Sequence, residues 1–251
     1  TLDYISEITE DFVELHGDRL SRDDAAIVAG LASVDGYKLM IIGHQKGRDI
    51  ESNIYRNFGM ASPEGYRKAL RLMRMAERFK LPILTFIDTS GAYPGIEAEE
   101  KGQSEAIAKN LAEMFGIKVP IVAVVIGEGG SGGALGIGVA DSILMLENSV
   151  YSVISPEGCA TILFNDSKKA PDAARSLKID SISLKSFGII DGIVKEPLGG
   201  AHRDLKQASI NLKTAVLKEF KKIDKFEIEN LLEKRYNKYR KIGEFFEKEG
   251  E

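Results

Sequence analysis

Apolar positions recur along the chain with two periods, one typical of helices and one of buried strands. In residues 4–15 they return every three or four positions, which predicts an opening helix. Residues 26–34 and 37–43 are instead almost continuous apolar runs around Asp35-Gly36, a dipeptide that favours a two-residue hairpin turn. Ser62-Pro63-Glu64 then supplies an N-cap, a first-turn proline and an acid, so we predict a helix from there through residue 79.

A pattern of strand, glycine loop and helix follows, and it occurs twice. Residues 82–88 (PILTFID) form a short apolar run that enters a loop rich in glycine and proline at 89–95, before an acid-led helix through residue 114. Residues 120–126 (PIVAVVI) and the loop at 127–133 (GEGGSGG) repeat the arrangement, and the small residues at 134–140 are expected to form a tightly packed helix. Continuous apolar strands separated by helices indicate a parallel sheet buried on both faces. Both loops are then expected at the carboxyl ends of neighbouring strands, where open α/β sheets bind ligands.

The remaining pattern predicts shorter elements and a charged tail. Further strands are expected at 142–146, 150–154 and 189–194, and helices at 156–164 and 170–177. Beyond Gly199-Gly200 the chain is highly charged with helical periodicity, which predicts a helical C-terminal tail. Since no linker separates an independent unit, we predict one domain over residues 1–251, with a core at 1–203 and C-terminal helices at 204–251.

Composition narrows the classes of function. With 34 basic and 38 acidic side chains the formal net charge is −4, which gives no case for nucleic acid as the main partner. The single cysteine, Cys159, excludes an internal disulfide and a Cys-rich zinc site, and it favours a reducing, cytoplasmic setting. His16, His44 and His202 are scattered without ligand spacing, so no bound metal is expected. No apolar run is long enough for a membrane span, and no secretory signal is expected.

The second glycine loop is the most informative segment. Gly129, Gly130, Gly132 and Gly133 surround Ser131 between a strand and a helix, so the backbone can come close to a ligand. A helix that starts at such a loop presents unpaired N–H groups, which suit a phosphate or an oxyanion. The alternative is that the glycines only allow tight packing of the strand on the helix.

The same residues also fit the G-x-S-x-G pattern of serine hydrolases, with Ser131 as the nucleophile and Asp191 and His202 following in the usual order. In a loop this rich in glycine, however, the pattern is easily met by chance. Glu128 would also lie beside the nucleophile, and a similar glycine loop follows the neighbouring strand.

Cys159 begins a predicted helix, but a lone cysteine is more often a small buried apolar residue than a nucleophile.

The stretch from Lys46 to Lys80 is rich in Arg and Lys, which are expected to form mainly a solvated helix face, with one or two of them binding phosphate. Whether this stretch contacts the phosphates of CoA is left open by the sequence. The chain has no P-loop motif, so nucleotide hydrolysis is not expected.

Several segments together resemble one known family, the carboxyltransferase alpha subunits of bacterial-type acetyl-CoA carboxylase. They are, in chain order, IIGHQKGR (41–48), RNFGM (56–60), PEGYRKALRLM (63–73), GAYPG (91–95), GQSEAIA (102–108), the glycine loop with Ala134 (127–134), YSVISPEGCA (151–160) and EPLGGAHR (196–203). The resemblance spans nearly the whole chain, and this order of motifs is highly specific.

What the resemblance implies is a crotonase-like (ClpP/crotonase) α/β fold of repeated ββα units, and a role in fatty-acid synthesis. Such subunits work with a beta subunit that carries a zinc ribbon and most of the CoA site, usually as α2β2. Together they transfer a carboxyl group from carboxybiotin, held on the biotin carboxyl carrier protein, to acetyl-CoA, which gives malonyl-CoA. ATP is used by the separate biotin carboxylase component, so no ATP site is expected here.

The resemblance also implies roles for individual residues. Gly132 and Gly133 match the two glycines whose N–H groups receive the ureido carbonyl of biotin, as an oxyanion hole. Substrate-binding roles fall, by the same match or by position, on the neighbouring residues Gly129, Gly130, Ser131, Ala134, Gly91, Ala92, Tyr93, Pro94 and Gly95.

The chain departs from the family pattern in three ways. Ser90 stands where a proline is usual, Ala29 replaces the first glycine of a pair, and relatives commonly carry a longer N-terminal region. Three classes of function fit the sequence: a carboxyltransferase subunit, a serine hydrolase using Ser131, and a non-catalytic assembly subunit. The sequence leaves open the choice between acetyl-CoA and propionyl-CoA, the affinity for the beta subunit and any regulation.

Overall fold

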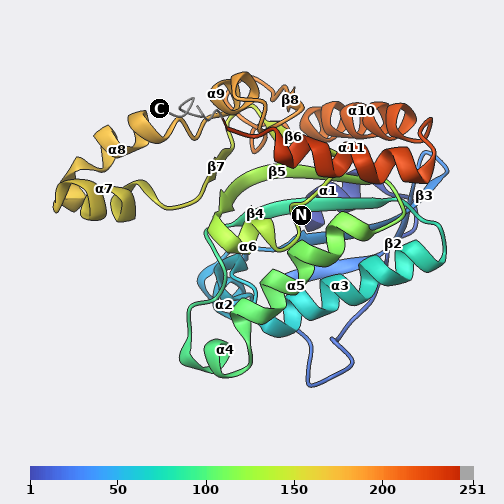
Figure 1. Ribbon diagram of the computed structural model, residues 1–251, viewed down its shortest axis with the longest axis horizontal. Coiled ribbons are helices and arrows are strands. Elements are labelled where there is room, and N and C mark those ends of the chain that lie inside the picture. Colours follow the sequence, from blue (N-terminus) through green and yellow to red (C-terminus); the bar gives the residue numbers. More distant parts are fainter. Residues whose placement is uncertain (244–251) are drawn as a thin grey trace, which may run out of the picture.

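The fold is a mixed sheet between two layers of helices (Figure 1). The computed structural model describes residues 1–243. Within them the strands pair in the order β1 (Val13–Glu14), β2 (Ile27–Val34), β3 (Tyr37–His44), β4 (Ile83–Thr89), β5 (Ile121–Gly130), β6 (Ser142–Leu146) and β8 (Gly192–Val194), while β7 (Val150–Ser152) pairs with the far end of β5. Pairing is antiparallel from β1 to β3 and parallel for the other pairs. The predicted hairpin and parallel strands are therefore confirmed.

Helices cover both faces of this sheet. One face packs against α3 (Pro63–Arg78) and α5 (Gln103–Gly116), and the other against α1 (Leu2–Ile8), α10 (Leu205–Ile223) and part of α11 (Ile228–Arg240). The shorter helices are α2 (Ile50–Tyr55), η1 (Asn57–Gly59), α4 (Ile96–Glu100), α6 (Ser131–Leu135), α7 (Pro156–Phe164), η2 (Ser167–Lys169), α8 (Ala170–Leu177) and α9 (Ser181–Ser186). No described helix is long and apolar enough to cross a membrane.

The continuous apolar strands follow from this arrangement. Successive side chains of a strand point to opposite faces of the sheet, so a sheet covered on both faces needs apolar residues at every position. In β4, Ile83 and Ile87 join the core beneath α3 and α5, whereas Leu84 and Phe86 join the core beneath α1 and α10.

Most predicted elements form where expected. The hairpin turn places Asp35 at φ 49° and Gly36 at φ 76°, the left-handed region that the Asp-Gly pair favours. The helices α3, α7 and α8 begin at Pro63, Pro156 and Ala170 as predicted.

The prediction of one opening helix through residue 15 is wrong beyond Ile8. Thr9 is extended, and Val13–Glu14 form an edge strand opposite Leu31 and Gly30 of β2. The apolar spacing of residues 12–15 also suits an edge strand, and the long-range pairing with β2 decides the outcome. A further correction concerns the helix predicted to run through residue 114: it is interrupted at Gly102, whose φ is 81°, so two helices form.

The predicted loop at 127–133 also differs from the structure. Residues 127–130 continue β5, because β7 pairs alongside them from Glu128 to Gly130. The helix predicted for residues 134–140 begins earlier, at Ser131, and ends at Leu135. The following small residues remain buried, and Gly136 packs so closely on Tyr66 that a Cβ there would lie 2.6 Å from the ring.

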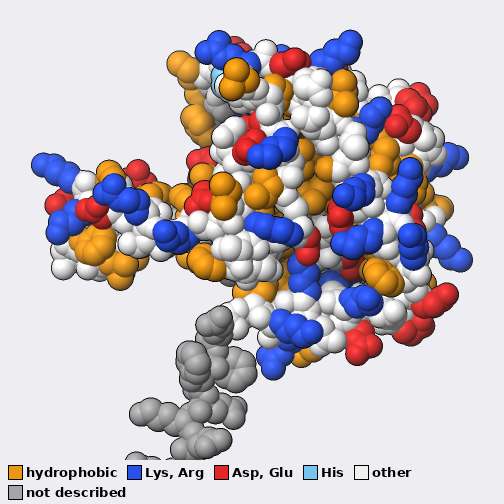
Figure 2. Space-filling view, turned by 90° about the horizontal axis from the view of Figure 1, so that it is seen from above, with side chains coloured by type: hydrophobic (Ala, Val, Ile, Leu, Met, Phe, Trp, Pro, Cys, Tyr) orange, Lys and Arg blue, Asp and Glu red, His pale blue; other side chains and the backbone are white. Residues whose placement is uncertain are grey.

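An arm made of α7, η2 and α8 projects from the rest of the molecule (Figures 1 and 2). Its core is small, with Cys159, Ala160 and Ala173 as the fully buried apolar members, so Cys159 is indeed a packing residue. By contrast Ile162 and Leu163 are 70% and 64% exposed.

The predicted tail packs on the core through α10 and α11. Arg235 of α11 is 1% exposed, pairs with Asp141 at 2.7 Å and donates to the backbone carbonyls of Met114, Ile117 and Val119. The last part of the predicted tail, residues 244–251, lies outside the described residues, and the division at residue 203 stays a prediction.

Candidate active site

The two glycine loops meet at the carboxyl ends of β4 and β5, as the sequence predicted. A Cβ at Gly130 would collide with the backbone of Ser90, and a Cβ at Gly133 would collide with the backbone of Gly91 and Ala92. Only glycine allows this close approach. The structure therefore brings together Gly91 and Ala92 from one loop and the segment Gly130–Gly133 from the other.

The first turn of α6 supplies hydrogen-bond donors at this junction. Ser131 has a φ of 50°, which turns the chain from the extended end of β5 into the helix. The first N–H groups of a helix have no acceptor within it. Among the turn, loop and side-chain hydrogen bonds of residues 1–243, none uses the N–H of Gly132, Gly133 or Ala92 as its donor. Gly132 is partly exposed, and a Cβ there would meet nothing closer than the Ile107 side chain at 3.9 Å.

Two buried side chains hold this turn from the helix layer. Tyr66 of α3 donates from its hydroxyl to the carbonyl of Gly133 at 3.2 Å. Asn110 of α5 donates to the carbonyl of Gly136 at 2.9 Å and to that of Tyr66 at 3.0 Å. Burial raises the pKa of Tyr66, so its hydroxyl stays a neutral donor. The position of the donors is thus fixed by α3 and α5.

A bulge in the sheet beside the loop is filled by Asp88, which sequence reasoning missed. The register of β4 against β5 shifts between Ile87 and Thr89. Asp88 accepts the N–H of Glu128 at 3.1 Å, and a Cβ at Gly127 would lie 2.5 Å from the same carboxylate oxygen. The carboxylate therefore accepts the Glu128 N–H at a point where the strand pairing is interrupted. It fits there because Gly127 has no side chain. The available signal was an acid at the end of an otherwise apolar strand.

Lys46, just after β3, joins Asp88 to Glu128. Its ammonium lies 3.1 Å from the Asp88 carboxylate and 2.5 Å from that of Glu128. Burial works against the charged ammonium, but the two carboxylates outweigh it and raise the pKa of Lys46. The ends of three neighbouring strands are therefore tied together at the edge that carries the loops.

His44, at the end of β3, is fully buried close to this region. Neither ring nitrogen has a hydrogen-bond partner among the described residues. Burial lowers the pKa of His44 to about 4, against the opposing effects of the Asp88 carboxylate and of the nearby backbone of Gly133 and Phe86, which lies outside good hydrogen-bond geometry. The imidazole is therefore neutral at pH 7.

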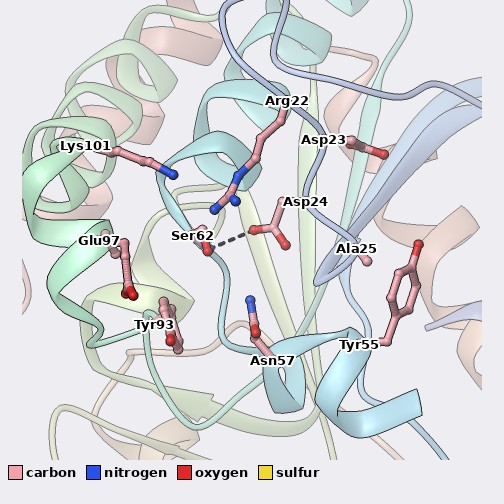
Figure 3. Close-up of a pocket in the computed structure, with 11 residues that line it drawn as sticks. Arg22, Asp23, Asp24, Ala25, Tyr55, Asn57, Ser62, Tyr93, Glu97 and Lys101 are labelled. Carbon is pink, nitrogen blue, oxygen red and sulfur yellow. Dashed lines mark hydrogen bonds between the residues drawn. The ribbon is translucent and has the colours of Figure 1, made fainter. Parts of the chain in front are cut away.

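The first glycine loop borders a polar cavity of about 430 Å³ (Figure 3). Tyr93 lines this cavity together with Asn57, Ser62 and Lys101, whereas Pro94 is exposed. Gln103 of α5 donates to the carbonyl of Tyr93 at 2.8 Å and fixes the loop.

The serine hydrolase alternative finds no support in the structure. Ser131 is exposed with a positive φ, as a nucleophile on a sharp turn would be, but among residues 1–243 no hydrogen bond joins it to Asp191 or His202. Asp191 accepts the N–H of Ile143 at 2.7 Å, pairs with Lys238 and precedes the amino end of β8. Ser131 follows the carboxyl end of β5, and parallel strands place these two ends at opposite edges of the sheet.

The basic residues of α3 have partners that the sequence did not predict. Lys68 is 1% exposed and binds Asp23 at 2.5 Å and the carbonyl of Asp24 at 2.8 Å. Arg71 donates to the carbonyls of His16 and Gly17. The prediction of a solvated face is therefore wrong for these two residues, which hold the loop before β2.

Within residues 1–243, no group of three or more His, Cys, Asp or Glu side chains is placed to hold a metal ion.

Comparisons with known proteins give a consistent result. The family profile described as "Acetyl co-enzyme A carboxylase carboxyltransferase-like" matches residues 1–243. A protein of Fusobacterium nucleatum subsp. nucleatum named acetyl-coenzyme A carboxylase carboxyl transferase subunit alpha is 65% identical over 245 residues, which cover 98% of this chain and 78% of that protein. A protein of the same name from Bacillus cytotoxicus is 59% identical, over 97% of this chain and 75% of its own length.

Solved structures share the fold at low sequence identity. Transcarboxylase 12S superposes with a TM-score of 0.68 at 17% identity, over 99% of this chain and 42% of the other. A Pseudomonas malonate decarboxylase hetero-dimer gives 0.62 at 17% identity, over 78% of this chain and 82% of the other. These similarities confirm the predicted crotonase-like fold.

Proposed function

The chain belongs to the acetyl co-enzyme A carboxylase carboxyltransferase-like family, and from this premise we propose how its two glycine loops serve the reaction. It is an acetyl-CoA carboxylase carboxyltransferase alpha subunit, part of a biotin-dependent carboxyl transfer. The substrate on its side of the reaction is carboxybiotin, and the N–H groups of Gly132 and Gly133 receive the ureido oxygen of biotin.

The chemistry of carboxybiotin supports this assignment. When carboxybiotin releases CO₂, negative charge develops on the ureido oxygen, and donors already in place stabilise that charge more than they stabilise the neutral ground state. The main support for this assignment is the first turn of α6. Its N–H groups at Gly132 and Gly133 donate to no turn, loop or side-chain acceptor among residues 1–243, and Tyr66 holds the turn in place. The N–H of Ala92, from the adjoining loop, is proposed to help shape the same pocket together with Tyr93.

No side-chain nucleophile is required for this reaction. The biotin anion left after release of CO₂ takes a proton from the methyl group of acetyl-CoA, and the resulting enolate attacks CO₂ to give malonyl-CoA. Ser131 is therefore proposed to border the pocket together with Gly129, Gly130 and Ala134, and not to react. We further propose that ATP is used by a separate component and that the subunit works in the cytoplasm.

The proposed partner is a beta subunit that binds acetyl-CoA, usually in an α2β2 assembly. The term subunit in the relatives' names implies a complex of several chains. The projecting arm supports this proposal, because Ile162 and Leu163 of α7 are exposed and the arm has little core of its own. An exposed apolar surface of this kind is typical of a protein interface.

The proposed function is tested by mixing the chain with a bacterial beta subunit and measuring malonyl-CoA-dependent carboxylation of free biotin. Activity is expected from the mixture and from neither chain alone. Equal activity from the beta subunit without this chain would show that the alpha chain is not part of the site. Unreduced activity after Gly132 and Gly133 are altered would instead favour a non-catalytic assembly subunit.

A further inference from the structure

The outer face of α3 and α5 carries a groove with a volume of about 670 Å³, here called the basic groove. Six cationic side chains and two acidic ones line it, although the whole protein has a net charge of −4. The cationic residues are Arg19, Arg67, Arg71, Arg74, Arg78 and Lys109. The local charge is therefore opposite in sign to that of the molecule.

Only part of this positive charge is neutralised within the chain. Arg67 pairs with Asp18 at 3.0 Å, and Arg74 pairs with Glu113 at 2.6 Å. Arg19, Arg71 and Arg78 have no carboxylate within ion-pair distance among residues 1–243. Burial, and to a smaller extent the nearby charge of Arg19, lower the pKa of Arg71. The groove thus favours an anionic partner.

The apolar part of the lining indicates what kind of anion fits. Leu20 is 76% exposed at the groove, and Leu70 and Met75 also line it. A free phosphate would leave this apolar surface unused, whereas a protein surface can cover it while presenting carboxylates to the arginines. Surfaces that bind single-stranded nucleic acid usually carry aromatic side chains for base stacking, and none lines the groove in the described part of the chain. An acidic protein surface is the better match.

The groove is continuous with the candidate active site. Arg67 donates to the carbonyl of Lys101 at 3.1 Å, and Lys101 lines the polar cavity that contains Tyr93 (Figure 3). Tyr93 belongs to the loop whose Gly91 and Ala92 touch the first turn of α6. From Arg67 to Arg78 the helix extends about 16 Å away from that cavity, a length suited to contact with a small domain.

We propose that the basic groove docks an acidic surface of the protein that carries carboxybiotin, so that the biotin arm can extend along the Tyr93 cavity to Gly132 and Gly133. The inference rests on the proposed function, since it assigns a docking surface for the substrate of that reaction. Complementary charge of this kind accelerates association and makes it sensitive to salt.

The test compares free biotin with the biotinylated carrier protein of a bacterial acetyl-CoA carboxylase, in the mixture with a beta subunit. The groove variant is Arg19→Glu/Arg78→Glu/Lys109→Glu, which changes exposed side chains that do not hold the loop before β2. The matched control, Lys218→Glu/Lys221→Glu/Lys225→Glu, makes the same change in charge at and just beyond the end of α10, on the other side of the sheet, where basic side chains also gather (Figure 2). Circular dichroism and the thermal midpoint verify folding of both variants.

At low salt, the groove variant is expected to raise the KM for the biotinylated carrier about tenfold and to leave the rate with free biotin unchanged. The control variant is expected to match the wild type with both substrates. The wild-type KM for the carrier should also rise with ionic strength while that for free biotin does not, a measurement that needs no variant.

Three results would overturn the proposal. One is a groove variant that keeps the wild-type KM for the carrier, and another is a control variant that shows the same rise in KM. The third is a groove variant that loses binding to a labelled single-stranded RNA while its kinetics with the carrier stay intact. If the wild-type mixture carboxylates neither substrate, the proposed function itself fails. That outcome is distinct from a functional enzyme whose kinetics ignore the groove.

Discussion

Two adjacent glycines carry the chemistry at the scale of single residues, and they differ in what surrounds them. A Cβ at Gly133 would collide with the backbone of Gly91 and Ala92, whereas a Cβ at Gly132 has Ile107 at 3.9 Å as its nearest neighbour. Alanine at Gly133 should therefore displace the donors, whereas alanine at Gly132 should only remove a glycine. Comparing the two variants separates these effects.

Gly133→Ala is expected to lower kcat by a factor on the order of 10²–10³, because displacing a preorganised donor costs about 3 kcal/mol of transition-state stabilisation. Gly132→Ala keeps its N–H and meets no backbone, so a much smaller loss is expected. Steady-state rates of biotin carboxylation by the mixture with a beta subunit provide the measurement. Equal rates for the two variants would contradict the assigned geometry.

His44 gives a prediction for stability against pH. Its pKa is about 4 in the folded protein and about 6.5 in an unfolded chain, so between these values the unfolded state binds more protons. The free energy of unfolding should therefore fall as the pH decreases from about 6.5 to 4.

His44→Phe removes this titration and keeps a ring of similar size at a site where neither nitrogen has a partner among the described residues. Urea denaturation at pH 7.5 should show similar stability for the two proteins. At pH 5 the variant should be the more stable. Parallel pH curves for wild type and variant would show that His44 is not buried as a neutral base.

At the scale of elements, the bulge at Asp88 sets how the end of β5 is presented. Asp88→Ala leaves the N–H of Glu128 to water and Lys46 without one of its two carboxylates, so about 0.5–1.5 kcal/mol of stability should be lost. Asp88→Asn keeps an oxygen acceptor and should lose less.

Because the bulge positions the loop and does not touch substrate, both Asp88 variants should lower kcat more than they change the KM for free biotin. Chemical denaturation and steady-state kinetics measure the two effects. A large rise in KM with kcat unchanged would indicate instead that Asp88 contacts biotin.

The arm gives a second prediction for an element. Ile162→Glu/Leu163→Glu places two charges on exposed apolar positions of α7. The chain alone should keep its thermal midpoint, while its affinity for the beta subunit should fall at least tenfold, measured by analytical ultracentrifugation. Unchanged assembly would move the subunit interface away from the arm. Lys168→Glu/Lys178→Glu, which changes the charge of the same arm by twice as much without altering these apolar positions, provides the control for charge.

At the scale of the whole molecule, the sequence predicted what depends on local chemistry. Asp35-Gly36 specifies its turn through its own φ angles, and Pro63 and Pro156 mark helix starts, so these features were found correctly. The two glycine loops were correctly expected at neighbouring strand ends, because parallel connections leave few other arrangements.

Features decided by distant partners were missed. Val13–Glu14 form a strand only because β2 lies beside them, and residues 127–130 remain extended because β7 pairs with them. The roles of Asp88 and Lys46 depend on contacts between separate strand ends, which no periodicity reveals.

The most direct measurement is the position of biotin in a crystal structure of this chain with its beta subunit and free biotin. The ureido oxygen is expected to lie about 2.7–3.1 Å from the backbone nitrogens of Gly132 and Gly133. A ureido oxygen held by other groups, with both nitrogens beyond hydrogen-bond distance, would contradict this expectation.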